Sequence, residues 1–115
     1  MPYVQVRVSV ALTKEQIEKL AEEALNAIEL IPGKSAPVTM AEIVPDCRLY
    51  FGAVDSAPCA IVDVATNNNL DPAALKAYSK QICKVLNEIA HIELDRIYIK
   101  HYANPQWHTG KMFIE

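Results

Sequence analysis

The chain has 115 residues, of which 51% are hydrophobic and 22% charged, and this composition is typical of one soluble globular domain rather than a disordered or fibrous chain. Eleven Lys and Arg residues against fourteen Asp and Glu residues give a net charge of -3 without a basic run, which argues against nucleic acid as a partner. No apolar stretch is long enough to span a membrane, and Gln5 and Arg7 lie where a signal peptide has its apolar core, so we expect a single cytoplasmic domain over residues 1–115.

The first unit is predicted to be a strand followed by a helix. Residues 3–10 alternate between valines and mostly polar residues, as in a strand that is covered on one face. Thr13 and Gln16 have the spacing of a capping box, which predicts a helix start. Apolar residues at helical spacing follow until Pro32 and Gly33 end the run.

The rest of the chain is predicted to hold three strands and a second helix. The strands are residues 38–44, with 49–51 as a candidate short extension, 59–65 and 96–102. Asp71 is predicted to cap the helix, with Pro72 at its first position.

The order of these elements is strand, helix, strand, repeated once. It predicts an α+β fold of two βαβ-type pseudo-repeats, giving a four-stranded mixed sheet with both helices on one face. The other face would carry Gln5, Arg7 and similar residues, and we expect it to line a solvated interface between subunits.

Cysteines and histidines do not have the spacing of a metal site. Three cysteines without a CxxC pair predict free thiols that are buried or half-buried. His91, His101 and His108 are predicted to be exposed surface residues. We therefore expect neither a metal nor another cofactor.

Several motifs occur in the order found in one known family. They are Pro2, Gly33-Lys34, Val44-Pro45-Asp46, Phe51-Gly52, Pro58-Cys59-Ala60, Tyr78-Ser79-Lys80 and Asp95-Arg96-Ile97-Tyr98-Ile99. From Pro2 to Phe113 the chain resembles the macrophage migration inhibitory factor family of the tautomerase superfamily. The resemblance implies a homotrimer with active sites at subunit interfaces and an N-terminal proline as catalytic base. It also implies interconversion of keto and enol forms of small aromatic 2-oxo acids such as phenylpyruvate, or of dopachrome-like compounds.

The resemblance assigns candidate site residues. The catalytic residues would be Pro2, Lys34 and Tyr98. The substrate-binding residues would be Lys100, Thr66, Asn67, Val38, Trp107 and Phe113.

The assigned chemistry is consistent with these residue types. Tautomerisation needs one group that acts as base and acid near neutral pH, and a proline amine freed by removal of Met1 is such a group. Lys34 and Lys100 could bind a substrate carboxylate. Tyr98 could donate to the carbonyl oxygen, where negative charge develops.

The sequence departs from the family pattern at several pocket positions. Lys100 replaces a common asparagine, residues 66–69 read Thr-Asn-Asn-Asn where Ser-Ile-Gly-Gly is usual, and no aromatic residue lies within 35–38. The amides predict a more polar substrate, or weak activity on phenylpyruvate. Val62 breaks the CxxC motif of some relatives, so a thiol redox role is not expected.

Two other functions stay open. One is a cytokine-like trimeric protein-interaction module that binds a protein receptor and has weak or no catalytic activity. The other is a related reaction such as decarboxylation or dehalogenation, for which Arg7 and Arg48 are the available arginines. Secretion without a signal peptide remains an alternative to the cytoplasm, because relatives are exported in this way.

Overall fold

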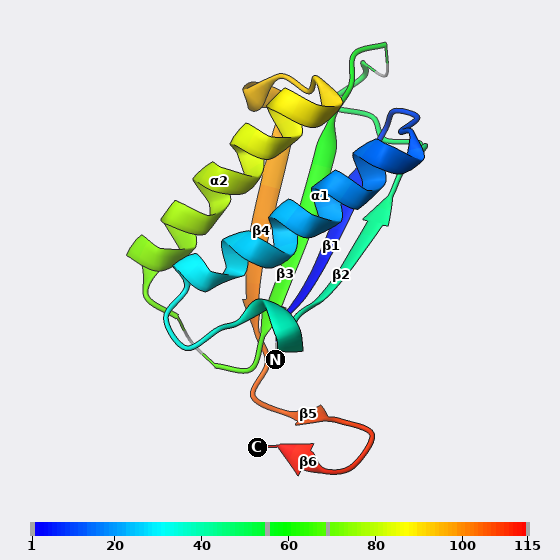
Figure 1. The fold of residues 1–115 in the computed structure, drawn as a ribbon. Helices are drawn as coiled ribbons and strands as arrows, with labels where there is room; N and C mark the ends of the chain where they lie inside the picture. Colours follow the sequence, from blue (N-terminus) through cyan, green and yellow to red (C-terminus); the bar gives the residue numbers. More distant parts are fainter. Residues whose placement is uncertain (1, 55, 69, 115) are drawn as a thin grey trace.

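The computed structural model describes residues 2–54, 56–68 and 70–114, and Figure 1 shows two helices lying over one face of a sheet. The main elements are β1 (Tyr3–Val8), α1 (Lys14–Ala27), β2 (Met40–Val44), β3 (Ala60–Thr66), α2 (Pro72–Ala90) and β4 (Ile97–Ala103). The shorter elements are three 3₁₀ helices, Ile28–Leu30, Ala36–Val38 and Leu94–Arg96, and the strands β5 (Trp107–His108) and β6 (Phe113–Ile114).

The four-stranded sheet has the order β2-β1-β3-β4. β1 is parallel to β2 and β3 is parallel to β4, whereas the central pair β1 and β3 is antiparallel. Each half is therefore a βαβ unit, and the prediction of a mixed sheet with both helices on one face is confirmed (Figure 1).

Local sequence signals explain where both helices begin. The Thr13 hydroxyl accepts a hydrogen bond from the Gln16 amide at 3.1 Å, and the Gln16 side chain accepts one from the Thr13 amide at 2.8 Å. Asp71 caps α2 by accepting from the Ala73 amide at 3.1 Å. Both caps satisfy backbone groups that a helix start would otherwise leave unpaired, as predicted.

The core lies between the helices and the sheet. The alternating valines of β1 and β3 point into it, and α1 and α2 cover them with apolar residues. Its largest fully buried side chains are Tyr78, Ile28, Ile31, Leu86, Ile92, Val4, Val8, Val62 and Val64.

The strand boundaries differ from the prediction: β3 and β4 each begin and end one residue later than predicted, and β1 and β2 are shorter. β1 ends at Val8, and beyond it the Val10 carbonyl accepts a hydrogen bond from the Asp46 amide, in the turn after β2. β2 begins at Met40 rather than Val38 because Pro37 lies in the 3₁₀ helix Ala36–Val38. The candidate extension at 49–51 is reduced to an isolated bridge between Phe51 and Val54.

The C-terminal hairpin of β5 and β6 was not predicted. Figure 1 shows it projecting from the body of the molecule beyond the end of β4, on the side where β1 starts. Its strands pair in an antiparallel register, with Trp107 opposite Ile114 and His108 opposite Phe113.

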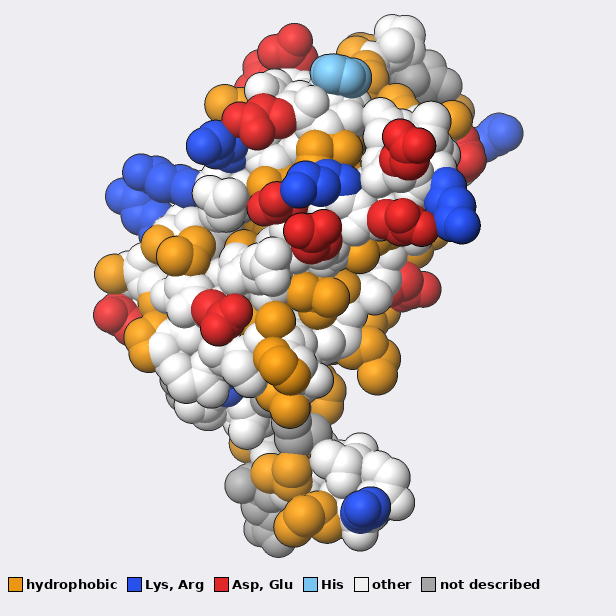
Figure 2. Space-filling view, viewed as in Figure 1, with side chains coloured by type: hydrophobic (Ala, Val, Ile, Leu, Met, Phe, Trp, Pro, Cys, Tyr) orange, Lys and Arg blue, Asp and Glu red, His pale blue; other side chains and the backbone are white. Residues whose placement is uncertain are grey.

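The outer surface of the helices is mixed in charge. Figure 2 shows Lys and Arg side chains interleaved with Asp and Glu side chains on this face. Lys19, for example, lies 3.9 Å from Glu22 and 3.3 Å from Glu23. Within the described ranges, no helix is long and apolar enough to cross a membrane.

Candidate active site

A cavity of about 960 Å³ opens at the start of β1, where the sheet meets the C-terminal hairpin. Pro2 is buried and forms part of its wall, and the Pro2 carbonyl accepts a hydrogen bond from the Met40 amide at 3.0 Å. Val38 and Trp107 supply apolar walls. One chain therefore brings together three of the predicted site residues, Pro2, Val38 and Trp107.

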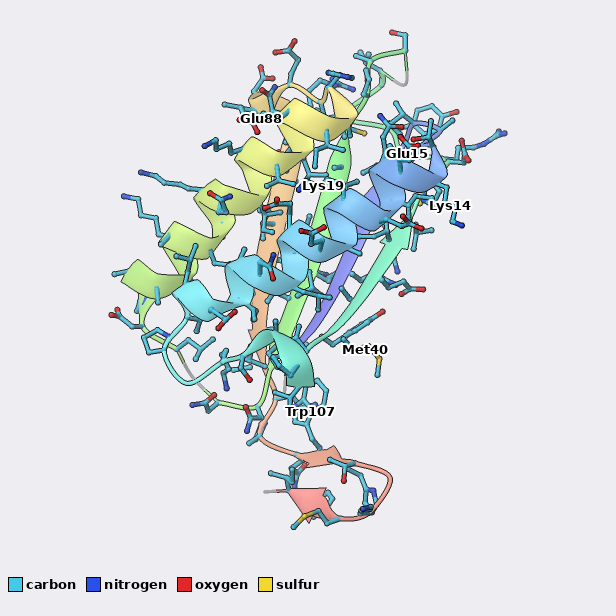
Figure 3. The ribbon with its side chains drawn as sticks, viewed as in Figure 1. Lys14, Glu15, Lys19, Met40, Glu88 and Trp107 are labelled. Atoms are coloured by element: carbon cyan, nitrogen blue, oxygen red, sulfur yellow. The ribbon has the colours of Figure 1, made fainter. Side chains whose placement is uncertain are left out.

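Trp107, the first residue of β5, lies next to the neck, the segment that joins β4 to the hairpin (Figure 3). Its indole Nε1 donates to the Asn104 carbonyl at 2.6 Å. The Asn104 amide in turn donates to the Thr66 carbonyl at 2.8 Å. These contacts attach the neck to the end of β3 and fix the indole beside the Pro2 cavity.

Lys34 is positioned by the turn after α1. Gly33 adopts a φ of 82°, a left-handed conformation that suits glycine, in the turn that follows the 3₁₀ helix Ile28–Leu30. The Lys34 ammonium reaches the loop after β3 and donates to Asn67 Oδ1 at 2.8 Å and to Asn68 Oδ1 at 2.7 Å. Burial lowers the pKa of Lys34.

The strand register relates Lys34 and its partners to Pro2. Tyr3 pairs with Ala65, so the next pair in the same register is Pro2 with Thr66. Thr66 is only 3% exposed, and its hydroxyl donates to the Asn68 carbonyl at 3.1 Å. Pro2, Thr66, Asn67 and Lys34 therefore share one end of the sheet.

Tyr98 lies near the other end of the sheet. It pairs with Ile61, which in turn pairs with Arg7. Its ring packs on Phe51 at a centroid distance of 5.2 Å, beside a separate cavity of about 200 Å³. A single chain does not bring Tyr98 to Pro2.

Lys100 lies on the sheet face that the helices leave open. Its ammonium forms an ion pair with Asp63 at 3.0 Å. It lines a third cavity, of about 430 Å³, together with Tyr3 and Tyr102. Among the described residues, Lys100 lines this third cavity and does not line the Pro2 cavity.

Phe113 lies on β6 and is 51% exposed. Its ring is 6.3 Å from that of His108, which does line the Pro2 cavity. Within one chain Phe113 therefore belongs to the hairpin, outside the described cavity wall.

Glu42 lines the Pro2 cavity, although it is not among the predicted site residues. The Tyr3 hydroxyl donates to Glu42 Oε1 at 2.5 Å, and Gln5 Nε2 donates to the same oxygen at 2.7 Å. These two hydrogen bonds lower the pKa of the Glu42 carboxyl, and the bond from Tyr3 has the larger effect. The hydrogen bond to Glu42 in turn raises the pKa of the Tyr3 hydroxyl. The period-2 pattern of residues 40–44 is the signal that places Glu42 beside Gln5 on the open face.

The prediction of three exposed histidines is wrong for His101. His91 and His108 are exposed, but His101 is half-buried between β4 and α2, with its Nε2 2.7 Å from the Ser79 hydroxyl oxygen. Burial lowers the pKa of His101.

The three cysteines are free and buried or half-buried, as predicted. The described residues contain no cluster of His, Cys, Asp and Glu that could hold a metal ion.

Comparison with known proteins identifies the family. The family model of macrophage migration inhibitory factor matches residues 1–112. The macrophage migration inhibitory factor of Rattus norvegicus is 31% identical over 100 residues, which cover 84% of this chain and 85% of that protein. The structure of Leishmania major MIF2 aligns with a TM-score of 0.88 and 23% identity over 96% of this chain and 94% of that one. The homologue from Prochlorococcus marinus aligns with a TM-score of 0.86 and 22% identity over 98% and 99%. The chain belongs to the macrophage migration inhibitory factor family.

Proposed function

We propose that this protein is a keto–enol tautomerase of 2-oxo acids such as phenylpyruvate, or of dopachrome-like compounds, with Pro2 as general base and acid. The observation that carries the proposal is the burial of Pro2 against a large cavity at the end of the sheet where Lys34 is held. The base is the secondary amine that removal of Met1 creates. Met1 itself lies outside the described residues.

The reaction is a 1,3-shift of a proton. In the keto-to-enol direction the neutral Pro2 amine removes a proton from C3 of the substrate. The electron pair of that C–H bond becomes the C2–C3 double bond, and the carbonyl oxygen takes a proton from solvent. In the reverse direction the Pro2 ammonium gives its proton to C3, the C2–C3 π electrons form the new C–H bond, and the enol hydroxyl loses its proton to solvent as the carbonyl re-forms, so no redox partner is needed.

The surroundings of Pro2 favour a neutral amine. Val38 and Trp107 are apolar walls, and an apolar environment disfavours the charged form of an amine. Lys34, at the same end of the sheet, adds a positive charge that acts in the same direction and attracts the substrate carboxylate.

We propose further that Tyr98 and Lys100 reach the site from a neighbouring subunit of a homotrimer. Two features support this: Tyr98 lies at the opposite end of the sheet from Pro2, and it is 61% exposed in the single chain. The Tyr98 phenol would donate to the substrate carbonyl oxygen. The polar open face of the sheet would form the subunit interface.

A second candidate function is a cytokine-like protein-interaction module with weak or no catalytic activity. It is favoured by Met112 and Phe113 of the hairpin, which are 60% and 51% exposed, because exposed apolar side chains of this size often mark a protein contact. In this function the protein would bind a protein receptor and would act outside the cell.

The decisive test measures the enol-to-keto conversion of phenylpyruvate by ultraviolet absorbance, with protein whose intact mass shows that Met1 is removed. We expect Pro2→Ala to lower kcat/KM by about 10²-fold or more. Pro72→Ala, at the exposed start of α2, is the matched control and should retain full activity. Full turnover by Pro2→Ala would contradict the proposal, and no turnover by the wild-type protein would favour the interaction module.

A further inference from the structure

The Lys34 ammonium is held by two side-chain amides from one loop. It donates to Asn67 Oδ1 at 2.8 Å and to Asn68 Oδ1 at 2.7 Å, so two of its three N–H groups are engaged. Among the ion pairs of residues 2–54, 56–68 and 70–114, none involves Lys34. The lysine is therefore positioned by neutral groups, and no carboxylate of the described residues pairs with its ammonium.

The same contacts decide how the two amides are oriented. An ammonium has no acceptor, so each amide must turn its oxygen toward Lys34 and its Nδ2 group away. Within the described ranges, neither Asn67 Nδ2 nor Asn68 Nδ2 donates to a protein acceptor. The hydrogen bond from the Thr66 hydroxyl to the Asn68 carbonyl holds the loop in this arrangement. The cluster of Lys34, Asn67 and Asn68 thus presents one ammonium N–H and two amide NH₂ groups.

Such a cluster favours one substrate class over another. An oxygen-rich ligand can accept from these donors, and a carboxylate offers about four lone-pair sites. An aryl group offers no comparable acceptor. When an aryl group covers the amides, their N–H groups lose their hydrogen bonds to water and gain none from the ligand. Unpaired N–H groups covered by ligand penalise binding, and this penalty discriminates strongly between substrates.

We propose that the cluster of Lys34, Asn67 and Asn68 selects 2-oxo acids that carry a second carboxylate, in preference to aryl-substituted 2-oxo acids. The inference rests on the proposed function for its reaction, but the binding preference can be measured without turnover. Asn67 and Asn68 are specificity-determining residues in this proposal. Thr66 supports them from the end of β3.

The catalytic arm of the test compares two substrates, the enols of oxaloacetate and phenylpyruvate, with wild-type protein and Asn67→Leu. We expect the wild-type protein to have the higher kcat/KM for oxaloacetate, and Asn67→Leu to lower the ratio of the two values by about tenfold or more. Asn26→Ala, an exposed change on α1, is the control and should leave the ratio unchanged. A higher wild-type kcat/KM for phenylpyruvate, or a ratio that Asn67→Leu leaves unchanged, would overturn the proposal.

The binding arm uses two non-reacting probes, malonate and phenylacetate, and follows the Tm of the protein. We expect malonate to raise the Tm of the wild-type protein and of Asn26→Ala more than phenylacetate does. In Asn67→Leu and Asn68→Ala we expect the two probes to raise the Tm equally. If the wild-type protein turns over neither enol but shows this pattern, the proposed function fails and the subsite stands. If malonate has no advantage in the wild-type protein, the subsite fails whatever the activity.

Discussion

Pro2, directly before β1, and Tyr98, on β4, lie toward opposite ends of one sheet in which only β3 separates β1 from β4. From Tyr3 to Arg7, whose partner Ile61 pairs with Tyr98, the strand advances four residues, or about 13 Å at a rise of about 3.3 Å per residue. One substrate places its C3 and its carbonyl oxygen only a few ångströms apart, and each must lie about 3 Å from its catalytic group. The Tyr98 ring instead packs on Phe51 at the far end of the sheet, so the single chain does not bring both residues to one substrate. Two copies of the chain can, if the Tyr98 end of one meets the Pro2 end of the next.

Arg96 is predicted to position Tyr98. Its guanidinium donates to the carbonyls of Pro58 at 2.9 Å and Ala57 at 3.0 Å, and it lies 5.1 Å from the centre of the Phe51 ring, which packs on Tyr98. Arg96→Lys keeps the charge but loses the planar fork that reaches both carbonyls. We expect kcat to fall by about tenfold with KM nearly unchanged, because the phenol acts in the transition state. A rise in KM at constant kcat would contradict this role.

Stability is predicted to depend on the protonation of His101. Burial lowers its pKa, so the folded protein binds the proton less readily than the unfolded chain, in which the pKa is about 6.5. Stability is therefore complete above about pH 6.5 and is lost progressively as the pH falls through the unfolded and then the folded pKa. Urea unfolding at a series of pH values should show this loss in the wild-type protein. The loss should persist in His91→Gln and become smaller in His101→Phe, and an unchanged loss in His101→Phe would contradict the prediction.

Tyr78→Phe is predicted to leave stability unchanged or to raise it. Tyr78 is fully buried, its hydroxyl has no hydrogen-bond partner among the described residues, and burial raises its pKa. Removing a buried hydroxyl that is unpaired takes away a desolvation cost, which is about 1 kcal/mol or more. Urea unfolding measures the change, and Tyr78→Leu, which also removes the ring, should instead lower stability. A loss of more than about 1 kcal/mol in Tyr78→Phe would mean that the hydroxyl is hydrogen-bonded.

Local signals in the sequence predicted most of the fold. The alternation of residues 3–10, the capping box at Thr13 and the cap at Asp71 act over a few residues. Both caps appear at their expected places, and the strand forms over Tyr3–Val8. The hairpin of β5 and β6 was missed because strands of two residues carry no measurable periodicity. The composition of residues 38–44 predicts a strand from Val38, but Pro37 beside it favours the 3₁₀ helix Ala36–Val38, so the strand starts at Met40.

The candidate site could be predicted only in part. Pro2, Lys34 and Asn67 came from a resemblance, since their residue types alone are common in any protein. Lys34 contacts Asn67 and Asn68, which follow it in the sequence by 33 and 34 positions. No local sequence pattern indicates a pairing over such a distance. The separation of Tyr98 from Pro2 follows from the strand register, which the sequence leaves open. The antiparallel pairing of β1 and β3 decides it.

The measurement that tests the shared site most directly mixes two variants that each lack one of the proposed catalytic groups. Pro2→Ala and Tyr98→Phe subunits are unfolded together, refolded and assayed with phenylpyruvate enol, each variant alone serving as its own control. If each site takes Pro2 from one subunit and Tyr98 from the next, random assembly restores about one quarter of the wild-type sites. We expect the mixture to recover activity near this level. A mixture no more active than the average of its two parents would contradict a site shared between subunits.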